Sequence, residues 1–311
     1  MISIPKDLHE LPRFEDGWSF LYLEHCKIEQ EAKAIASYDA EGKVCIPCAS
    51  LSFLLLGPGS SISHEAVKNL SENGCLIGWC GEGSVRFYAH GYGETRKTTK
   101  LTKQAKLVSV GSLRLKVVRN MYQLRFKDPL PEDYTLEQLR GLEGQRMKKA
   151  YSTASSKTGV KWSGRVYKIN DWSQADPVNR ALSSANACLY GICHAAIISM
   201  GYSPGLGFIH TGKQLSFVYD IADLYKEEIT IPIAFEAASL GLPNLERNVR
   251  LLCRDSFNKN NLLPRIVQDI EKVLSVEIPE EEYPDFDAED AYPAGIWDPN
   301  LGHITGGVNF G

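Results

Sequence analysis

The stretch between Asp176 and Gly201 constrains the fold of this chain more than any other part of its sequence, because it is long and apolar on most sides. Asp176 followed by Pro177 is typical of a helix start, since the carboxylate caps free N–H groups and proline fits the first helical position. Gly201 is typical of a helix end, so we predict one helix that runs to Met200. A helix that is apolar on most sides belongs at the centre of a helical domain.

The pattern of the chain changes near the sequence GYGET, at residues 91–95. Upstream, short β-branched or aromatic runs alternate with turn residues, as in a β-rich domain. These runs are WSFLYLE, AIASYD, KVCIP, LSFLLL, CLIGWC and VRFYAHG. One helix interrupts them at about 64–73, where Ser63 is placed to cap its first turn. Downstream, from Lys97 to about 275, the period is helical.

We therefore predict an α+β protein with a β-rich, β-sandwich-like domain at residues 1–92 and an all-helical domain at residues 96–276. Within the helical domain, Thr135 and Gln138 form a capping box that opens another helix. Two further helices are predicted after Asn244.

The composition of the chain predicts a cytoplasmic protein without a membrane segment. The first residues, MISIPKDLHELPRFEDGWSF, have no basic start followed by an apolar run, so they do not resemble a signal peptide. The long apolar helix contains Asn186, His194 and Ser199, which favours a core helix over a membrane span. We therefore expect the eight cysteines to be free thiols in a reducing compartment.

A second interpretation of the cysteines stays open, because Cys45 and Cys48 form a CxxC. The pair is compatible with a redox function, or with half of a zinc site whose other half is Cys75 and Cys80. All four cysteines lie in or beside predicted strands, where cysteine is a common small core residue. We therefore expect them to belong to the core.

The charge of the chain is divided unevenly along its length. Residues 277–311 contain nine acidic residues and no Lys or Arg, which leaves 34 basic and 29 acidic residues in 1–276, a net charge of +5. Ten basic residues and no acid lie between Arg96 and Lys127, and seven basic residues and no acid lie between Arg146 and Lys168. One such run is compatible with a solvated helix face, but two runs without acids favour a polyanionic partner.

Glu143 lies in the middle of an apolar face of its predicted helix. The other members of this face are Leu136, Leu139, Met147 and Ala150. A buried carboxylate without a partner is unfavourable, so Glu143 requires a cation, a hydrogen-bond network or a metal ion. Arg140 or Arg146 on the same helix could supply the cation. The sequence leaves the salt bridge and the metal site both open.

The sequence HTGKQLSFVYDIADLYK begins at His210 and concentrates charge beside apolar residues. If a helix begins near Ser216, Asp220 and Asp223 share one of its faces. A structural histidine and a solvated helix face would explain the pattern as well as a binding site does. Together with Glu143, however, the histidine and aspartate form a set of N and O ligands that suits Mg²⁺ or Mn²⁺.

Three long stretches of the sequence resemble one known family. They are LRGLEGQRMKKAY, DPVNRALSSANACLYGICHAAIISMGYSPGLGFIHTGKQLSFVYDIADLYK and LLLGPGSSISHEAVKNLSENGCLIGWCGEGSVRFYAHG. These stretches resemble the CRISPR-associated spacer-acquisition integrases, the family often called Cas one, in their subtype I-E form. The resemblance runs from about residue 18 to about residue 275. It implies an N-terminal β domain and a helical catalytic domain that holds one metal site.

Matched position by position, the resemblance implies that Glu143, His210 and Asp223 are ligands of Mg²⁺ or Mn²⁺. It implies that Asp220 belongs to the catalytic group as an acidic neighbour just outside the ligand set. The implied reaction is the transesterification of CRISPR adaptation, in which a 3′-hydroxyl of protospacer DNA attacks a phosphodiester at the repeat boundary. No protein nucleophile is needed for this reaction.

The implied partners are double-stranded DNA with 3′ overhangs, CRISPR repeat DNA and a small ferredoxin-like protein, Cas two. The resemblance implies that the integrase forms a homodimer and that two such dimers flank one Cas two dimer.

The resemblance also implies three groups of DNA-binding residues. The arginines that clamp the DNA backbone are Arg86, Arg140, Arg165, Arg247 and Arg250. The aromatic residues that stack on a nucleotide are Tyr167, Trp172 and Tyr190. The residues that grip the 3′ end are Lys213, Tyr219 and Lys226. Core packing is the alternative for the aromatic residues, and Arg247 could instead pair with Glu246 or Asp255.

Two other functions stay open from the sequence. A non-catalytic DNA-binding scaffold would keep the basic runs without needing Glu143 on an apolar face. A stand-alone metal-dependent endonuclease acting on branched repair DNA would have the same site, because one phosphoryl transfer can run toward water or toward a 3′-hydroxyl.

The tail at residues 277–311 is acidic and contains proline and glycine, so we expect a mobile arm that does not fold alone. Near its end, AGIWDPNLGHITGGVNFG supplies several apolar residues. We interpret this segment as a docking segment for the partner or for the 3′-end pocket, and packing against its own domain is the alternative.

If the basic runs contact DNA phosphates, the affinity for duplex DNA should fall steeply as the salt concentration rises, because each contact releases counterions. Fluorescence anisotropy titrations at several salt concentrations measure this dependence. We expect Lys97, Lys100 and Lys103 to contribute less than the arginines. An affinity that stays constant between low and moderate salt would contradict the assignment of the basic runs to DNA binding.

Overall fold

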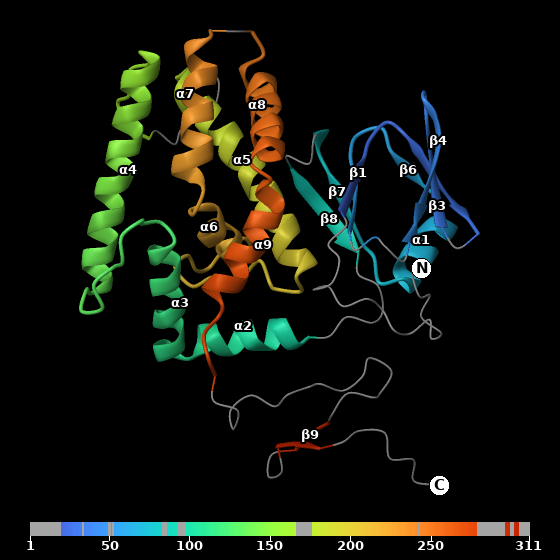
Figure 1. The fold of residues 1–311 in the computed structure, drawn as a ribbon, viewed down its shortest axis with the longest axis horizontal. Helices are drawn as coiled ribbons and strands as arrows, with labels where there is room; N and C mark the ends of the chain where they lie inside the picture. The colour runs from blue at the N-terminus through green and yellow to red at the C-terminus, as the bar shows by residue number, and fades with distance from the viewer. Residues whose placement is uncertain are drawn as a thin grey trace.

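The computed structural model of the chain has a strand-rich N-terminal part and a helical C-terminal part, which lie side by side (Figure 1). This arrangement confirms the predicted α+β class. The structure describes residues 20–32, 34–48, 51, 53–82, 86–91, 98–165, 176–241, 243–278, 296–298 and 302–304.

Two four-stranded sheets are formed by the described part of the N-terminal region. The first contains, in spatial order, β1 (Phe20–Leu23), β5 (Phe53–Leu56), β7 (Leu76–Cys80) and β8 (Phe87–Gly91). The second contains β4 (Gly42–Pro47), β3 (Ala34–Asp39), β2 (Lys27–Glu31) and β6 (Ser61–Ile62). The first three strands of the first sheet are parallel, and β8 is antiparallel to β7.

The helix predicted between these strands is α1 (His64–Glu72). Its cap is Ser63, as predicted, whose side chain accepts a hydrogen bond from the N–H of Ala66. α1 covers the second sheet, because Ala66 and Leu70 share a core with buried residues of β2 and β3.

β5 connects the two parts of the molecule, because it is buried on both faces. Leu54 and Leu56 pack in the core between the two sheets, and Phe53 and Leu55 pack on the opposite face against residues of the long helix α5. Successive side chains of a strand point to opposite faces, so a continuous apolar run is what a strand between two cores requires. The sequence FLLL therefore joins the sheets to the helical part.

β2 is a strand that the sequence did not predict. Its sequence, KIEQE, contains a single apolar residue, Ile28, which is fully buried in the core between the sheets. The backbone of β2 pairs with β3 on one side and with β6 on the other. Tertiary pairing therefore decides its conformation, and the side chains contribute little signal.

The helical part surrounds α5. Its elements are α2 (Thr99–Ser109), α3 (Gly111–Gln123), α4 (Leu136–Thr158), α5 (Pro177–Ser199), α6 (Ser216–Ala222), the π-helix η4 (Lys226–Thr230), α7 (Ile231–Ser239), α8 (Leu245–Lys259) and α9 (Leu262–Val273). A short antiparallel pair, β9 (Ile296–Asp298) and β10 (Gly302–Ile304), lies in the predicted tail.

α5 lies where its sequence predicts, at the centre of the helical part (Figure 1). Asp176 caps it by accepting a hydrogen bond from the N–H of Asn179, and Pro177 occupies the first turn. The helix has the length and composition of a membrane span, but 72% of its apolar window is buried inside the protein, as in a core helix.

The four cysteines that suggested a zinc or redox site do not gather into one. Cys48, Cys75 and Cys80 are buried, whereas Cys45 is exposed and its Sγ lies 3.7 Å from a carboxylate oxygen of Glu31. Within the described residues, no group of three or more His, Cys, Asp or Glu side chains forms a metal-binding cluster. The buried three are core residues of the sheets and of the segment next to them.

The capping box of α4 provides a test of this fold. Thr135 accepts a hydrogen bond from the N–H of Gln138, and the Gln138 side chain accepts one from the N–H of Thr135. We expect Thr135→Ala to lower the free energy of unfolding by about 1 kcal/mol, because the N–H of Gln138 would lose its side-chain acceptor. Thr135→Ser retains the hydroxyl and should unfold like the wild type in urea. Equal stability of all three proteins would contradict a contribution from this cap.

Candidate functional site

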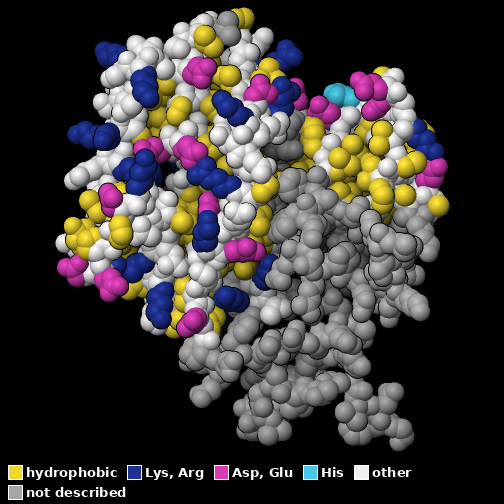
Figure 2. All heavy atoms as spheres, viewed as in Figure 1, with side chains coloured by type: hydrophobic (Ala, Val, Ile, Leu, Met, Phe, Trp, Pro, Cys, Tyr) yellow, Lys and Arg dark blue, Asp and Glu magenta, His cyan; other side chains and the backbone are white. Residues whose placement is uncertain are grey.

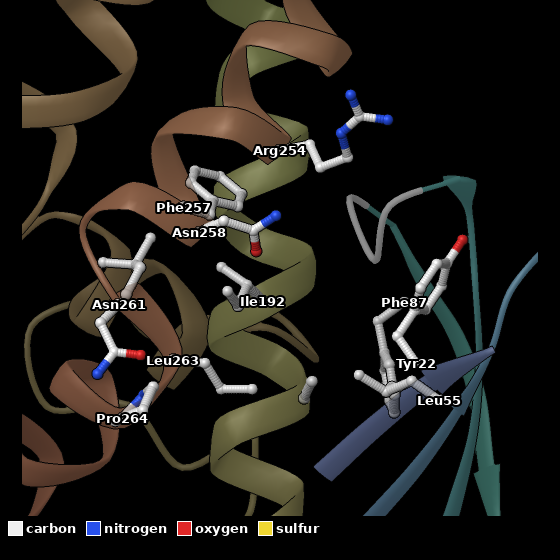
Figure 3. A pocket seen from close by; sticks show the side chains of 12 residues that line it. Tyr22, Leu55, Phe87, Ile192, Arg254, Phe257, Asn258, Asn261, Leu263 and Pro264 are labelled. Atoms are coloured by element: carbon white, nitrogen blue, oxygen red, sulfur yellow. The ribbon is translucent and has the colours of Figure 1, made fainter.

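The hollow between the first sheet and helices α5, α8 and α9 does not contain the predicted site residues (Figure 3). It is a cavity of about 270 Å³, with Tyr22 and Phe87 on the strand wall and Ile192, Phe257 and Leu263 on the helix wall. An apolar pocket is a frequent ligand site in proteins. None of the predicted catalytic or DNA-binding residues lines this one, so the candidate site lies elsewhere, around α4 and α6.

Asp220 of α6 is completely buried, and the loop before α6 is folded around its carboxylate. Oδ2 accepts hydrogen bonds from the N–H groups of Phe208 at 2.6 Å and Ile209 at 3.1 Å. Oδ1 accepts one from the N–H of His210 at 2.8 Å and contacts Nδ1 of the same histidine at 2.7 Å. Both oxygens are therefore occupied, and Asp220 is placed to orient His210.

The ring of His210 is fixed between two aspartates. An ionised carboxylate only accepts hydrogen bonds, so in the neutral ring beside it Nδ1 would carry the hydrogen shared with Asp220, and Nε2 would carry the lone pair. Nε2 lies 3.9 Å from Oδ2 of Asp223. The hydrogen bond to Asp220 raises the pKa of His210 above its usual value, although partial burial opposes this. In the neutral form of His210, the Nε2 lone pair and a carboxylate oxygen of Asp223 face each other across this gap.

Lys226 closes one side of this gap. Its Nζ lies 2.6 Å from Oδ1 of Asp223 and 5.2 Å from the centre of the Tyr190 ring. Burial alone would lower the pKa of Lys226, but the Asp223 carboxylate and Tyr190 raise it overall, so the lysine stays charged. Tyr219 lies between, with its ring centre 4.9 Å from that of Tyr190 and 5.9 Å from that of His210.

These contacts bring Tyr190, Tyr219 and Lys226 to one place. α6 begins at Ser216, as predicted, but ends at Ala222, so Asp223 is its C-cap and Lys226 opens the π-helix η4. A π-turn often marks a functional site.

Glu143 is held by arginines. Its helix face is apolar as predicted, with Leu139 fully buried. Arg146 donates to both carboxylate oxygens, at 2.8 Å and 2.9 Å, and Arg125 donates to one of them at 3.3 Å. Arg146 also pairs with Glu227 of η4. Of the two alternatives that the sequence left open, the salt bridge is therefore present, and its first partner is one of the two arginines expected. The function of Glu143 as a metal ligand stays a prediction.

Comparison with known proteins places the chain in a family. A family model described as CRISPR associated protein Cas1 matches residues 123–241. The CRISPR-associated endonuclease Cas1 2 of Thermus thermophilus is 48% identical over 311 residues, which cover 100% of this chain and 95% of the relative. The CRISPR-associated endonuclease Cas1 of Escherichia coli is 41% identical over 290 residues, which cover 93% and 94%.

The fold supports the same assignment. The crystal structure of the TtCas1–DNA complex matches with a TM-score of 0.81 at 49% identity, and the match covers 86% of this chain and 100% of that one. The chain belongs to the Cas1 family. This result confirms the family resemblance inferred from the sequence motifs.

Three arginines of the first basic run of this Cas1 family member form hydrogen bonds with other groups of the protein. Arg114 donates to the carbonyl oxygen of Phe208, Arg119 donates to that of Tyr134, and Arg125 contacts Glu143. No local pattern in the sequence indicates these contacts, because their partners are backbone carbonyls or lie outside the acid-free run. The predicted phosphate contacts are therefore left to the remaining basic residues. On the face shown in Figure 2, Lys and Arg side chains are spread over the helical part.

The predicted backbone clamps have different environments. Arg86, Arg140 and Arg247 are exposed, and Arg250 is partly exposed. The two acids that could have paired with Arg247 have other partners, since Glu246 pairs with Arg180 and Asp255 with Arg254.

Arg165 differs from the other clamps, because it is tied to the first turns of α5. It donates to the carbonyl oxygen of Asn179 at 3.0 Å and to Oγ of Ser183 at 2.8 Å. Lys213 is exposed, as its predicted contact with DNA requires. Tyr167 and Trp172 lie outside the described residues.

The sequence analysis did not identify Gln104 and Arg114 as site residues, although both hold the loop that carries His210. Gln104 is fully buried although it lies within the basic run, and Arg114 reaches the same loop from the next helix. A glutamine on the apolar side of an amphipathic helix is the one local signal of such a contact, because a buried amide requires partners.

A glycine in this loop allows a test of its geometry. A Cβ on Gly207 would lie 2.4 Å from the carbonyl oxygen of His210 and 2.7 Å from Cβ of Ser216, which is too close. We expect Gly207→Ala to lower the free energy of unfolding by about 1–3 kcal/mol through overpacking.

Gly205→Ala is the matched control for this test. Its Cβ would meet the carbonyl oxygen of Gln214 at 3.6 Å, an ordinary contact, so we expect stability close to the wild type in urea unfolding. Equal effects of the two substitutions would show that the loop is not packed as described.

Proposed function

We propose that this protein is a metal-dependent DNA integrase of CRISPR adaptation. It would insert protospacer DNA at the repeat boundary by attack of a 3′-hydroxyl on a phosphodiester. Membership of the Cas1 family supports this proposal, as do the relatives named endonucleases and the TtCas1 structure that contains DNA. The observation that carries it is the facing pair of His210 and Asp223, with the other nitrogen of His210 committed to Asp220.

The donor chemistry of this pair fits a divalent cation. His210 offers Nε2, and Asp223 offers Oδ2, which is the oxygen that Lys226 does not contact. A histidine ligand whose second nitrogen is hydrogen-bonded to a carboxylate is the usual arrangement at metal sites. One nitrogen and carboxylate oxygens suit Mg²⁺ or Mn²⁺. When bound, such a cation lowers the pKa of the attacking hydroxyl and neutralises charge on the phosphoryl group.

Glu143 is the third ligand in this proposal, and it must exchange partners to act as one. Its two oxygens are engaged by Arg146, and one of them also by Arg125. Glu227 already contacts Arg146 from the other side, so the arginine keeps a carboxylate partner when Glu143 leaves it. A carboxylate that moves between arginine and a ligand position would keep its charge compensated in both states.

The other residues of the site bind and orient the nucleotide. Lys226 stays protonated beside Asp223 and offers its charge to a phosphate oxygen. Tyr190 and Tyr219 are partly exposed and present rings next to this charge, as a nucleotide at a 3′ end requires. The exposed clamps Arg86, Arg140 and Arg247 would contact the backbone of the duplex.

The proposal includes the homodimer and the partner Cas two, with two integrase dimers around one Cas two dimer. Family membership supports this assembly. Size-exclusion chromatography with light scattering, with and without Cas two, gives the stoichiometry directly.

Substitution of the ligands tests the proposed function. We expect Glu143→Gln and Asp223→Asn to reduce strand transfer by more than the 10- to 100-fold that loss of a residue orienting a metal ligand typically costs. Both variants should weaken Mn²⁺ binding in calorimetry and retain DNA binding, because the phosphate contacts lie elsewhere. Glu137→Gln is the matched control, since Glu137 is exposed on the same helix.

The same assay separates the alternatives. Full strand transfer by Glu143→Gln would contradict the proposed site, and activity in neither the wild type nor the variants would favour a DNA-binding scaffold. Cleavage of branched DNA without any strand transfer, even with Cas two present, would favour a stand-alone endonuclease.

A further inference from the structure

The loop from Ser203 to His210 is fixed at its base by a buried glutamine of α2. Nε2 of Gln104 donates to the carbonyl oxygens of Ser203 at 3.0 Å and Leu206 at 2.9 Å. Its Oε1 accepts a hydrogen bond from the N–H of Ser203 at 2.7 Å. Both ends of the amide are therefore used, and Gln104 is completely buried. This part of the loop cannot shift without leaving polar groups unpaired in the interior.

Arg114 of α3 holds the same loop closer to His210. Its Nε and Nη2 both donate to the carbonyl oxygen of Phe208, at 2.9 Å and 2.7 Å. This carbonyl belongs to the peptide group that carries the N–H of Ile209, and that N–H donates to Oδ2 of Asp220 at 3.1 Å. One peptide group thus lies between a guanidinium and a carboxylate, and its dipole is aligned with both charges.

We propose that Arg114 is a positioning residue for His210, because it fixes the Phe208–Ile209 peptide group whose N–H holds the Asp220 carboxylate against the imidazole ring. A buried carboxylate is unfavourable unless its charge is compensated. Hydrogen bonds in a chain polarise one another, so a cation at the carbonyl end strengthens the N–H bond at the other end. Held in this way, Oδ1 of Asp220 stays within hydrogen-bond distance of Nδ1 of His210, and Nε2 faces Asp223.

The alternative is that Arg114 contacts a DNA phosphate, since it belongs to the first basic run. The hydrogen bonds of Arg114 do not favour this alternative, because its Nε and Nη2 both donate to the carbonyl oxygen of the buried Phe208. Lys116 lies two residues further along α3 and is exposed. It carries the same charge without the contact with Phe208, so it is the matched control.

The tautomer of His210 tests the proposal without any metal. Nitrogen-15 NMR of the metal-free protein, at a pH where His210 is neutral, distinguishes a protonated Nδ1 from a protonated Nε2. We expect the wild type and Lys116→Met to hold the hydrogen on Nδ1. Arg114→Met should give a mixture of both tautomers, and Arg114→Lys, which keeps a charged donor, should restore the wild-type signal.

The second readout is Mn²⁺ affinity, and it rests on the proposed function of His210 as a ligand. We expect Arg114→Met to raise the Kd for Mn²⁺ by about 10- to 100-fold, the effect of losing a group that orients a metal-binding histidine. Lys116→Met should leave the Kd unchanged. Failure of the wild type to bind Mn²⁺ would contradict the metal site, and the tautomer measurement would still decide the positioning function of Arg114.

Folding of each variant is checked by circular dichroism. If Arg114→Met does not fold, Arg114→Gln, which leaves a neutral donor, takes its place with the same expected results. A wild-type tautomer and a wild-type Kd in a folded, uncharged variant would overturn the proposal. The proposal would also be overturned if Arg114→Met changed nothing except the salt dependence of DNA binding. A reduced salt dependence would identify Arg114 as a phosphate contact.

Discussion

The buried carboxylate of Asp220 is the constraint on which the candidate site depends. It has no exposed surface, and it collects the N–H groups of three successive residues and Nδ1 of His210. An isolated buried charge is strongly unfavourable, so the loop must wrap around it in one conformation. That conformation turns Nε2 of His210 toward Asp223. A residue predicted to stand just outside the ligand set therefore determines the orientation of His210.

The same requirement for charge compensation organises the surroundings of the site. Glu143 is compensated by Arg125 and Arg146, and Asp223 by Lys226. Arg125 is almost fully buried, and its guanidinium lies 5.0 Å from the centre of the Tyr122 ring, which partners its face. Arginine is therefore used in two ways in this chain. Some guanidinium groups fix carboxylates or loop carbonyls inside the protein, and others, such as those of Arg86, Arg140 and Arg247, stay exposed.

Much of the fold follows from local patterns that have a local physical cause. The caps at Ser63, Thr135 and Asp176 were predictable because each satisfies N–H groups of its own helix within three residues. β5 was predictable because both of its faces are apolar. β2 was not, because one buried residue, Ile28, carries no recognisable period, and its conformation is imposed by pairing with β3 and β6.

Residue types and short spacings predict the α+β class, the central position of α5, and the position of His210 ahead of a helix that carries two aspartates. The family follows from the resemblance of three long stretches of the sequence to known proteins. The contacts of Glu143 with Arg125 and Arg146, and of Gln104 and Arg114 with the loop of His210, become visible in the folded chain alone. Gln104 and Ser203 are 99 residues apart in the chain, and Arg114 and Phe208 are 94 apart. Contacts over such separations leave no local pattern, because the packing of whole helices brings them together.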